Sequence, residues 1–309
     1  MKRYLTYLLP LLLMALFLTG CDRAATTVSA PDPEPQTFSV TVKDDAGETL
    51  TLDEVPQRLL SLAPSNTEIL FALDLGERIV GVTDFCDFPE DAKEKDKVGG
   101  FADPNVEKIL AFEPDLVFAV PGFQDPVVVR LRDEGFNVFV VNPTTVDELP
   151  DIIRRIGRVA DVEDNADELA GELEDRISAV REKVAEATGK PSVFYEVYSE
   201  PLMTAGKKTL INDVIGVAGG ASLGNELDED YPQFSLETLI EKDPDVYLAS
   251  TGSMSEPKDI AAREGWDGLN VSANGRIHVI DENIINRSGP RLIDALEQFA
   301  ELIHPGLFK

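Results

Sequence analysis

The chain has 309 residues, 43% of them hydrophobic, and is therefore long enough to bury a core in each of two ordinary lobes. Its 57 acidic residues outnumber 28 basic residues and leave a formal net charge of −29 at pH 7. A surface this acidic argues against binding of nucleic acid and against electrostatic attraction to anionic lipid headgroups, which both need clustered lysine and arginine.

The first twenty residues have the layout of a signal peptide. Lys2 and Arg3 precede an almost wholly apolar stretch, residues 4–17, which is too short to span a bilayer comfortably. Leu18-Thr19-Gly20-Cys21 follows and resembles the bacterial lipobox, in which the cysteine is acylated and becomes the mature N-terminus. The alternative is an ordinary signal peptide with an incidental cysteine. No second apolar run of spanning length occurs in the sequence, so we expect membrane attachment through lipid on Cys21.

An acidic, proline-rich segment, residues 22–36, comes next and has too few bulky apolar residues to build a core. We expect an extended, disordered tether there. The other cysteine of the chain is Cys86, so acylation of Cys21 leaves no partner for an intramolecular disulfide.

The first predicted folded element is a β-hairpin, because residues 38–42 and 48–52 alternate between apolar and polar around Asp45-Ala46-Gly47. Short, continuously apolar runs follow, separated by helical stretches, at residues 58–62, 79–82, 116–119 and 138–141. Such runs are typical of strands buried on both faces of a parallel sheet. After Pro64, the spacing of Ser65 and Glu68 before an apolar run predicts a capping box at the start of a helix.

Residues 165–187 contain no proline, and their apolar side chains recur at steps of three and four, which predicts one long amphipathic helix. On either side of it, residues 106–119 align without gaps on residues 236–249, with a glutamate, an apolar pair, an acid, Pro-Asp and an apolar strand in register. A single repeat of this kind indicates two similar lobes and not a solenoid. The ligand cleft is expected between the lobes.

These features divide the chain into five predicted parts. They are a signal peptide over residues 1–20, a lipidated cysteine and tether over 21–36, an N-terminal lobe over 37–160, a bridging helix over 161–189 and a C-terminal lobe over 190–309.

Three groups of residues resemble a known family: Ser61-Leu62-Ala63-Pro64-Ser65-Asn66-Thr67-Glu68, the two Pro-Asp segments, and Trp266-Asp267-Gly268-Leu269 through Arg287-Ser288-Gly289-Pro290-Arg291. They are similar to the class III solute-binding proteins of ABC importers, which carry cobalamin, haem or ferric siderophores. The resemblance implies an α/β fold of two lobes, each a mainly parallel sheet flanked by helices, joined by one long backbone helix. It also implies a monomer without catalysis or cofactor, lipid-anchored at the outer face of the cytoplasmic membrane (periplasm or cell surface). Its partners would be an ABC permease and the ATPase subunits.

Within this family the chain looks most like the cobalamin-binding members, through residues 81–89 and the segment that contains Arg287. Phe85, Phe101 and Tyr231 align with positions where those members place aromatic side chains against the ligand, and flat rings suit a broad corrin. Arg287 matches an arginine that reaches the ligand there. The alternatives are that the aromatic residues plug the lobe surfaces and that Arg287 forms a salt bridge in an acid-rich protein.

Glu107 and Glu237 occupy equivalent positions in the repeat, each two residues after a helix-capping residue, Asn105 or Ser235. A carboxylate in the first turn of a helix can simply complement the helix dipole. The resemblance implies a further role, because the matching glutamate on each lobe of the family meets an arginine pocket of the permease. One acid on each lobe suits docking onto a two-fold symmetric partner.

The cobalamin assignment has haem as its first alternative. Val120 stands where the cobalamin-binding relatives carry a tryptophan, so this chain has fewer aromatic side chains to surround a corrin. The two histidines, His278 and His304, show no metal-ligand spacing, and the sequence has no CxxC motif or acidic metal cluster, so no metal site is predicted. Haem binding usually needs an axial His, Met or Tyr, for which Met203 and Tyr198 remain candidates.

A ferric siderophore is the second alternative within the fold. An anionic siderophore favours a cleft rich in cations, and the candidates are Arg287, Lys207 and Lys208. An enzyme of the chelatase or reductase kind is the remote alternative, since two-lobed α/β scaffolds also support catalysis. The sequence contains no GxSxG, P-loop or GxGxxG motif, which weighs against it.

Overall fold

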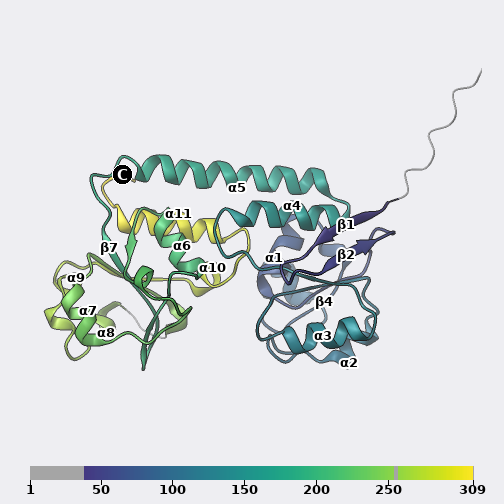
Figure 1. The fold of residues 1–309 in the computed structure, drawn as a ribbon, viewed down its shortest axis with the longest axis horizontal. Helices are drawn as coiled ribbons and strands as arrows, with labels where there is room; N and C mark the ends of the chain where they lie inside the picture. The colour runs from purple at the N-terminus through teal and green to yellow at the C-terminus, as the bar shows by residue number, and fades with distance from the viewer. Residues whose placement is uncertain (1–37, 254–256, 309) are drawn as a thin grey trace, which may run out of the picture. The chain divides into compact units, whose positions relative to one another are not determined.

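The computed structural model describes residues 38–253 and 257–308, so the predicted signal peptide, the Cys21 lipid site and the tether lie outside the described residues. The described residues belong to one compact unit, Thr37–Lys309. They form an α/β fold of two lobes, each built on its own sheet, with helix α5 connecting them (Figure 1). Among the described helices, none combines the length and the apolar character needed to cross a membrane.

The N-terminal lobe is built on a parallel sheet with the strand order β4-β3-β5-β6. The predicted hairpin, β1 and β2, is antiparallel, and its turn joins the sheet because the Asp45 N–H donates to the Val140 carbonyl oxygen at 3.0 Å. The lobe comprises β1 (Val40–Lys43), β2 (Thr49–Leu52), β3 (Leu59–Ser61), α1 (Pro64–Ala72), β4 (Ile79–Val82), α2 (Val106–Ala111), β5 (Leu116–Ala119), α3 (Asp125–Asp133), β6 (Val138–Val140) and α4 (Glu148–Ala160), with 3-10 turns at Gly76–Arg78 and Glu90–Glu94.

The C-terminal lobe has a mixed sheet in the order β11-β10-β7-β8, in which β9 also pairs with β7 and β8 is the antiparallel strand. It comprises β7 (Ser192–Ser199), β8 (Leu202–Thr204), α6 (Leu210–Val217), β9 (Ala221–Ser222), α7 (Leu236–Lys242), β10 (Val246–Ser250), α8 (Pro257–Ala261), α9 (Asn270–Ala273), β11 (Ile277–Ile280), α10 (Glu282–Ile285) and α11 (Leu292–Ile303), with 3-10 turns at Leu223–Glu226, Thr251–Ser253 and Trp266–Gly268. Both sheets are mainly parallel, as the sequence predicts.

Helix α5, Glu163–Val184, is one continuous helix, but it begins and ends earlier than the predicted residues 165–187. It begins early because Asp161 has a left-handed backbone (φ 58°) and turns the chain sharply out of α4. The acidic side chains of Glu163 and Asp164 then lie in the first turn, where the helix dipole favours negative charge. The apolar pattern could not predict this start because the turn depends on a single backbone conformation.

Ion pairs fix α5 to both lobes. Arg154 of α4 donates to Glu174 of α5, with an Nη1–Oε1 distance of 2.5 Å. Toward the other lobe, Arg176 of α5 donates to Glu297 of α11 through two hydrogen bonds of 2.9 and 2.7 Å. Two-point contacts of this kind hold the side chains in one geometry. These pairs attach the middle of α5 to both lobes, so the helix does not act as a free linker.

The sequence repeat corresponds to equivalent structure in the two lobes. Asn105 and Ser235 cap α2 and α7. The side chain of each accepts a hydrogen bond from the backbone N–H three residues further along the chain, that of Lys108 or Thr238. Glu113 and Asp243 end these helices with positive φ angles of 43° and 40°. The following aspartate of each Pro-Asp pair accepts from backbone N–H groups where β3 and β7 begin. The repeat therefore encodes a cap, a helix stop and a strand anchor.

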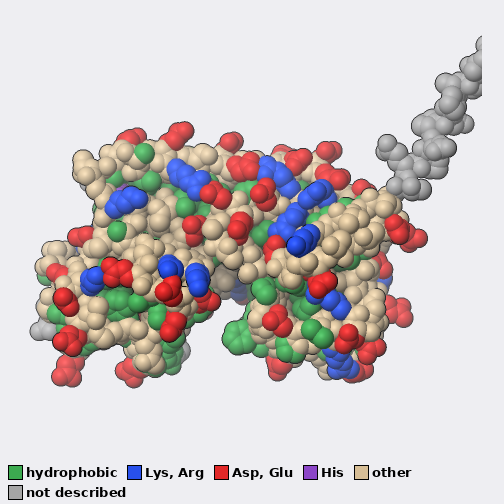
Figure 2. Space-filling view, viewed as in Figure 1, with side chains coloured by type: hydrophobic (Ala, Val, Ile, Leu, Met, Phe, Trp, Pro, Cys, Tyr) green, Lys and Arg blue, Asp and Glu red, His purple; other side chains and the backbone are tan. Residues whose placement is uncertain are grey.

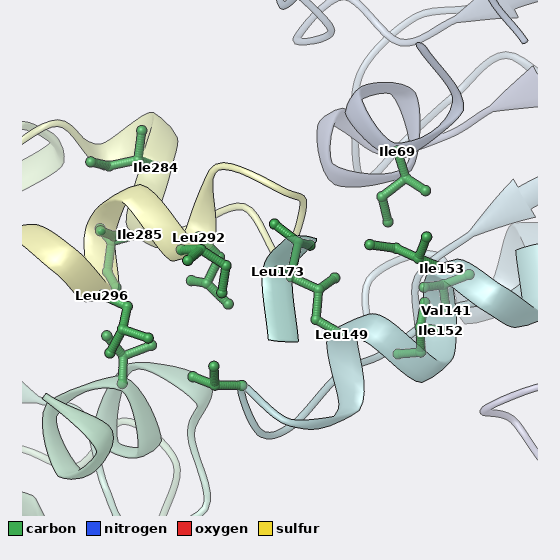
Figure 3. Close-up of a cluster of buried hydrophobic side chains, with 14 of the residues drawn as sticks. Ile69, Val141, Leu149, Ile152, Ile153, Leu173, Ile284, Ile285, Leu292 and Leu296 are labelled. Atoms are coloured by element: carbon green, nitrogen blue, oxygen red, sulfur yellow. The ribbon is translucent and has the colours of Figure 1, made fainter. Parts of the chain in front are cut away.

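A single hydrophobic core runs through both lobes along α5. It includes Leu149 of α4, Leu173 of α5 and Leu292 of α11, all almost fully buried (Figure 3). Smaller cores lie on the other faces of the two sheets. Each Å² of apolar surface removed from water contributes about 25 cal/mol of stability. The shared core is therefore the main attraction between the lobes.

Candidate functional site

Ligands of parallel α/β sheets bind outside the carboxyl ends of the strands, at the point where the strand order reverses. In the N-terminal lobe this point lies between β3 and β5, because the chain runs from β3 to β4 on one side and from β5 to β6 on the other. Figure 2 shows the molecule hollowed between the lobes, with hydrophobic side chains on both walls. We therefore expect the binding residues in the loops that follow the strands of both lobes.

Phe85 lies in the loop after β4, with 59% of its surface exposed. Its neighbour Cys86 is buried and anchors the loop, since the thiol lies 3.1 Å from the Thr67 hydroxyl and 3.2 Å from the Thr83 hydroxyl. Burial raises the pKa of the Cys86 thiol, so it stays protonated at neutral pH. The Lys97 ammonium also donates to the Cys86 carbonyl oxygen at 3.1 Å. The cysteine has a structural role that holds Phe85 outward.

Phe101 lies in the next loop of the same lobe and is half-buried. A bridge between Gly99 and Pro104 closes this loop at its base. The Gly99 carbonyl oxygen also accepts from the Asp84 N–H at 2.9 Å, which ties the Phe101 loop to the Phe85 loop. The structure therefore brings these two predicted residues onto adjacent loops at the carboxyl end of the N-terminal sheet.

Tyr231 lies in the C-terminal lobe, with 50% of its surface exposed. The backbone on both sides of it is fixed, because the Gly206 N–H donates to the Asp230 carbonyl oxygen at 2.8 Å and the Thr204 N–H to the Pro232 carbonyl oxygen at 3.1 Å. A Cβ at Gly206 would stand 1.9 Å from the Glu229 carbonyl oxygen, so this approach requires glycine. Partial burial raises the pKa of the Tyr231 hydroxyl, which stays neutral. Tyr231 is thus presented from a rigid loop.

Arg287 lies among acids contributed by the other lobe. It donates to Asp87 at 2.6 Å and to Glu68 at 3.2 Å, and to Asn283 of its own lobe at 2.5 Å. Arg291 donates to the same Glu68 carboxylate through bonds of 2.9 and 2.6 Å. We call Glu68, Asp87, Arg287 and Arg291 the interlobe charge cluster.

The predicted capping box at Ser65 and Glu68 is wrong. The N-cap of α1 is Ala63, which makes no side-chain capping bond. Glu68 is instead buried and forms bonds with the two arginines of the other lobe, which the local spacing could not reveal. Pro64 at the first helical position starts the helix without a cap.

Charge pairing in the cluster shifts the pKa of Asp87. Burial by itself would raise that pKa, but the hydrogen bond and the positive charge of Arg287 outweigh burial and lower it. Asp87 is therefore ionised at neutral pH, and its half-exposed side chain can exchange partners with solvent or a ligand. A ligand contact by Arg287 would begin by displacing Asp87, because Glu68 is buried.

Glu107 and Glu237 are both exposed in the first turns of α2 and α7, as the repeat predicts. Glu107 accepts from Arg130 of α3 at 2.6 Å, in a pair that is open to solvent on both sides. Both carboxylates are therefore accessible to a partner protein.

Within residues 38–253 and 257–308, no group of three or more His, Cys, Asp and Glu side chains is arranged to hold a metal ion. His304 is buried, with Nε2 3.2 Å from the Gly219 carbonyl oxygen. Burial lowers the pKa of the His278 imidazole, so that histidine is neutral at pH 7.

The structure shows three further exposed aromatic residues, Phe88, Phe123 and Tyr198, of which Tyr198 is the candidate haem ligand of the sequence analysis. Phe123 follows β5, with 78% of its surface exposed, and Tyr198 is near the end of β7, with 47% exposed. The sequence carries a weak signal for Phe123, since Gly122-Phe123 lies in the short loop after the predicted strand 116–119.

Comparison with known proteins is consistent with this geometry. The periplasmic binding protein family model matches residues 59–284. A Bacillus subtilis (strain 168) protein named uncharacterized ABC transporter substrate-binding lipoprotein YvrC is 32% identical over 307 residues, covering 97% of this chain and 96% of that protein. The periplasmic vitamin B12 binding protein BtuF of Vibrio cholerae has a TM-score of 0.73 and 27% identity, covering 82% of this chain and 99% of that one. The periplasmic haem-binding protein RhuT from Roseiflexus sp. RS-1, in apo form, has a TM-score of 0.73 and 25% identity, covering 81% and 98%.

Proposed function

The chain belongs to the periplasmic binding protein family, and we propose that it is the solute-binding component of an ABC importer whose ligand is cobalamin or a related corrinoid. In this proposal it binds the ligand between its lobes without catalysis, as a monomer, and delivers it to a permease driven by ATPase subunits. The Bacillus subtilis relative, named an ABC transporter substrate-binding lipoprotein, supports the importer role.

The observation that carries the corrinoid assignment is that aromatic rings are exposed on fixed loops, whereas two of the three candidate cations, Arg287 and Lys207, are already paired with carboxylates. Phe85 and Tyr231 offer ring faces from opposite lobes. Arg287 is bound by two carboxylates, and Lys207 forms an ion pair with Asp228. A corrin edged by amides needs apolar contact more than it needs charge, whereas an anionic siderophore would need free cations. The name of the Vibrio cholerae structure supports the same ligand.

Haem is the second candidate, and one feature of the C-terminal lobe favours it. Tyr198 and Met203 are register partners on β7 and β8, and Tyr198 is half exposed. Both side chains are of kinds that ligate haem iron. The similarity to a haem-binding protein at 25% identity supports this alternative.

We further propose that Glu107 and Glu237 dock the two lobes onto the permease. Their equivalent caps place each carboxylate at the start of a short exposed helix, one on each lobe. A partner with two-fold symmetry would present two matching basic sites, and simultaneous engagement would raise the overall affinity by making the second contact intramolecular.

Cys21 is proposed as the lipid attachment site that holds the protein at the outer face of the cytoplasmic membrane. The lipobox-like residues before it and the lipoprotein name of the Bacillus subtilis relative support this. Changing Cys21 to Ala is expected to move the protein from the membrane fraction to the soluble fraction. Retention of the Cys21→Ala protein on membranes after a carbonate wash would contradict the proposal.

The ligand assignment is tested by titrating purified protein with cyanocobalamin, haemin and a ferric siderophore in separate calorimetric experiments. We expect saturable binding of cyanocobalamin at micromolar concentration or below, which corresponds to about −8 kcal/mol or stronger. Saturable binding of haemin with no heat from cyanocobalamin or hydroxocobalamin would transfer the assignment to haem.

A further inference from the structure

Phe123 is the most exposed of the large hydrophobic side chains in the described residues, at 78%. A single exposed apolar residue is common and by itself indicates nothing. The backbone beneath Phe123, however, is fixed by an unusual set of buried hydrogen bonds, and these bonds connect it to the other loops of the candidate site.

Gln124, the next residue, is fully buried and joins three loops through its side-chain amide. Its Nε2 donates to the Leu62 carbonyl oxygen at 2.6 Å and to the Phe101 carbonyl oxygen at 2.9 Å. Its Oε1 accepts from the Val120 N–H at 3.0 Å. A buried amide with three bonds is costly to disturb, because each lost bond leaves a buried polar group unpaired.

Two of those three bonds, to Leu62 and from Val120, lie at the reversal point of the strand order. Leu62 follows β3 and Val120 follows β5, the two neighbouring strands from which the chain leaves in opposite directions. A doubly wound sheet opens a crevice for ligand at this point. Gln124 bonds to the backbone on both sides of this point, at Leu62 and at Val120.

The turn before Gln124 directs Phe123 away from the core. Gly122 has a φ of 88°, which favours glycine, and its N–H donates to the Asp125 carboxylate at 2.9 Å. Helix α3 begins at Asp125, at the end of the lobe away from α5 (Figure 1). Gly122, Gln124 and Asp125 thus hold Phe123 outward although it contributes nothing to the core.

We propose that Phe123 is a ligand-contacting residue of the N-terminal lobe and that Gln124 is a positioning residue that holds the Phe101 and Phe123 loops as one wall. This inference rests on the proposed binding function and extends it to residues of this chain. The wall suits a ligand with a broad flat ring system, as corrinoids and porphyrins have.

The test measures the affinity of Phe123→Ala, Phe123→Trp and Val129→Ala for cyanocobalamin and for haemin. Val129 is the matched control, because it is an exposed apolar residue (58%) on α3, the helix that follows Phe123, and lies outside the strand-end loops. We expect Phe123→Ala to weaken binding about tenfold, Phe123→Trp to retain it within about twofold, and Val129→Ala to leave it unchanged. Thermal unfolding of Phe123→Ala should match the wild type.

The positioning role of Gln124 is tested by coupling. Gln124→Met should weaken binding in the wild-type background, and it should have little further effect when Phe101 and Phe123 are both Ala. An equal loss in both backgrounds would assign Gln124 a structural role alone and overturn its positioning role.

The outcomes separate this inference from the function on which it rests. Wild-type protein that binds neither cyanocobalamin nor haemin would overturn the proposed ligand class and this inference together. Wild-type binding with unchanged affinity of Phe123→Ala would overturn this inference alone. Unchanged affinity with reduced uptake by the importer would place Phe123 at the permease interface and would likewise overturn ligand contact.

Discussion

We expect a single change in the interlobe charge cluster, Glu68→Gln, to lower the free energy of unfolding by a large amount. The glutamate is 3% exposed and accepts three hydrogen bonds from Arg287 and Arg291. Gln keeps the size of the side chain, removes its charge, and turns an NH2 group toward arginine donors. Breaking a buried pair by removing one partner costs about 3–5 kcal/mol, because the remaining charge stays buried and unpaired.

The cost should lie near the lower limit, about 3 kcal/mol, for two structural reasons. Arg287 keeps its bonds to Asp87 and Asn283. Arg291 keeps its stacking on the Phe88 ring, 3.8 Å from the centroid, which stabilises a cation over an aromatic face. For a folded region of this size, about 3 kcal/mol corresponds to roughly 6–12 °C in the midpoint of thermal unfolding.

The assay is thermal and urea unfolding of the wild type, Glu68→Gln and a control, Glu90→Gln. Glu90 forms an exposed pair with Lys93, and its loss should leave the midpoint unchanged. The Glu68→Gln effect should also persist at high salt, because buried pairs are screened much less than exposed ones. A Glu68→Gln midpoint equal to that of Glu90→Gln would refute the reasoning.

Four further predictions follow from the same structure. Because pairing lowers the pKa of Asp87, its stabilising charge should be present above its usual pKa of about 4 and lost as pH falls through the lower folded value. Asp87→Asn should therefore destabilise the protein at pH 7 but not in acid, and an equal gap at pH 2 would contradict this. Tyr231→Ala should weaken cyanocobalamin binding about tenfold, or about 1.4 kcal/mol, through loss of ring contact, and unchanged calorimetry would remove Tyr231 from the site. Reversing charge at Glu107 and Glu237 should leave ligand affinity unchanged but reduce importer uptake more than additively, whereas normal uptake by the double Glu→Lys variant would exclude docking through them. Since α5 is paired to both lobes, ligand should change the radius of gyration in solution scattering only slightly, and a large compaction would mean that the lobes hinge elsewhere.

The resemblance to the family, and not a local pattern, selected Phe85, Phe101 and Tyr231. The structure places Phe85 and Phe101 in strand-end loops and Tyr231 in a loop bonded to β8, and their contact with a ligand stays a prediction. The arrangement of Arg287 was not predictable, because its acidic partners lie on the other lobe, and Glu68 is 219 positions away. Phe123 was missed because side-chain exposure depends on which neighbours the fold brings together.

The sequence by itself determined the local elements of this protein and their duplication. Apolar runs predict buried parallel strands, the three-to-four spacing predicts α5, and the aligned Pro-Asp segments predict two lobes with equivalent caps. These signals are local because backbone geometry imposes a period on the side chains of each helix or strand. Only the tertiary structure decided that Glu68 binds two arginines of the opposite lobe and that Gln124 joins three loops. A buried polar side chain must find partners wherever the packed chain presents them, and that requirement has no period in the sequence.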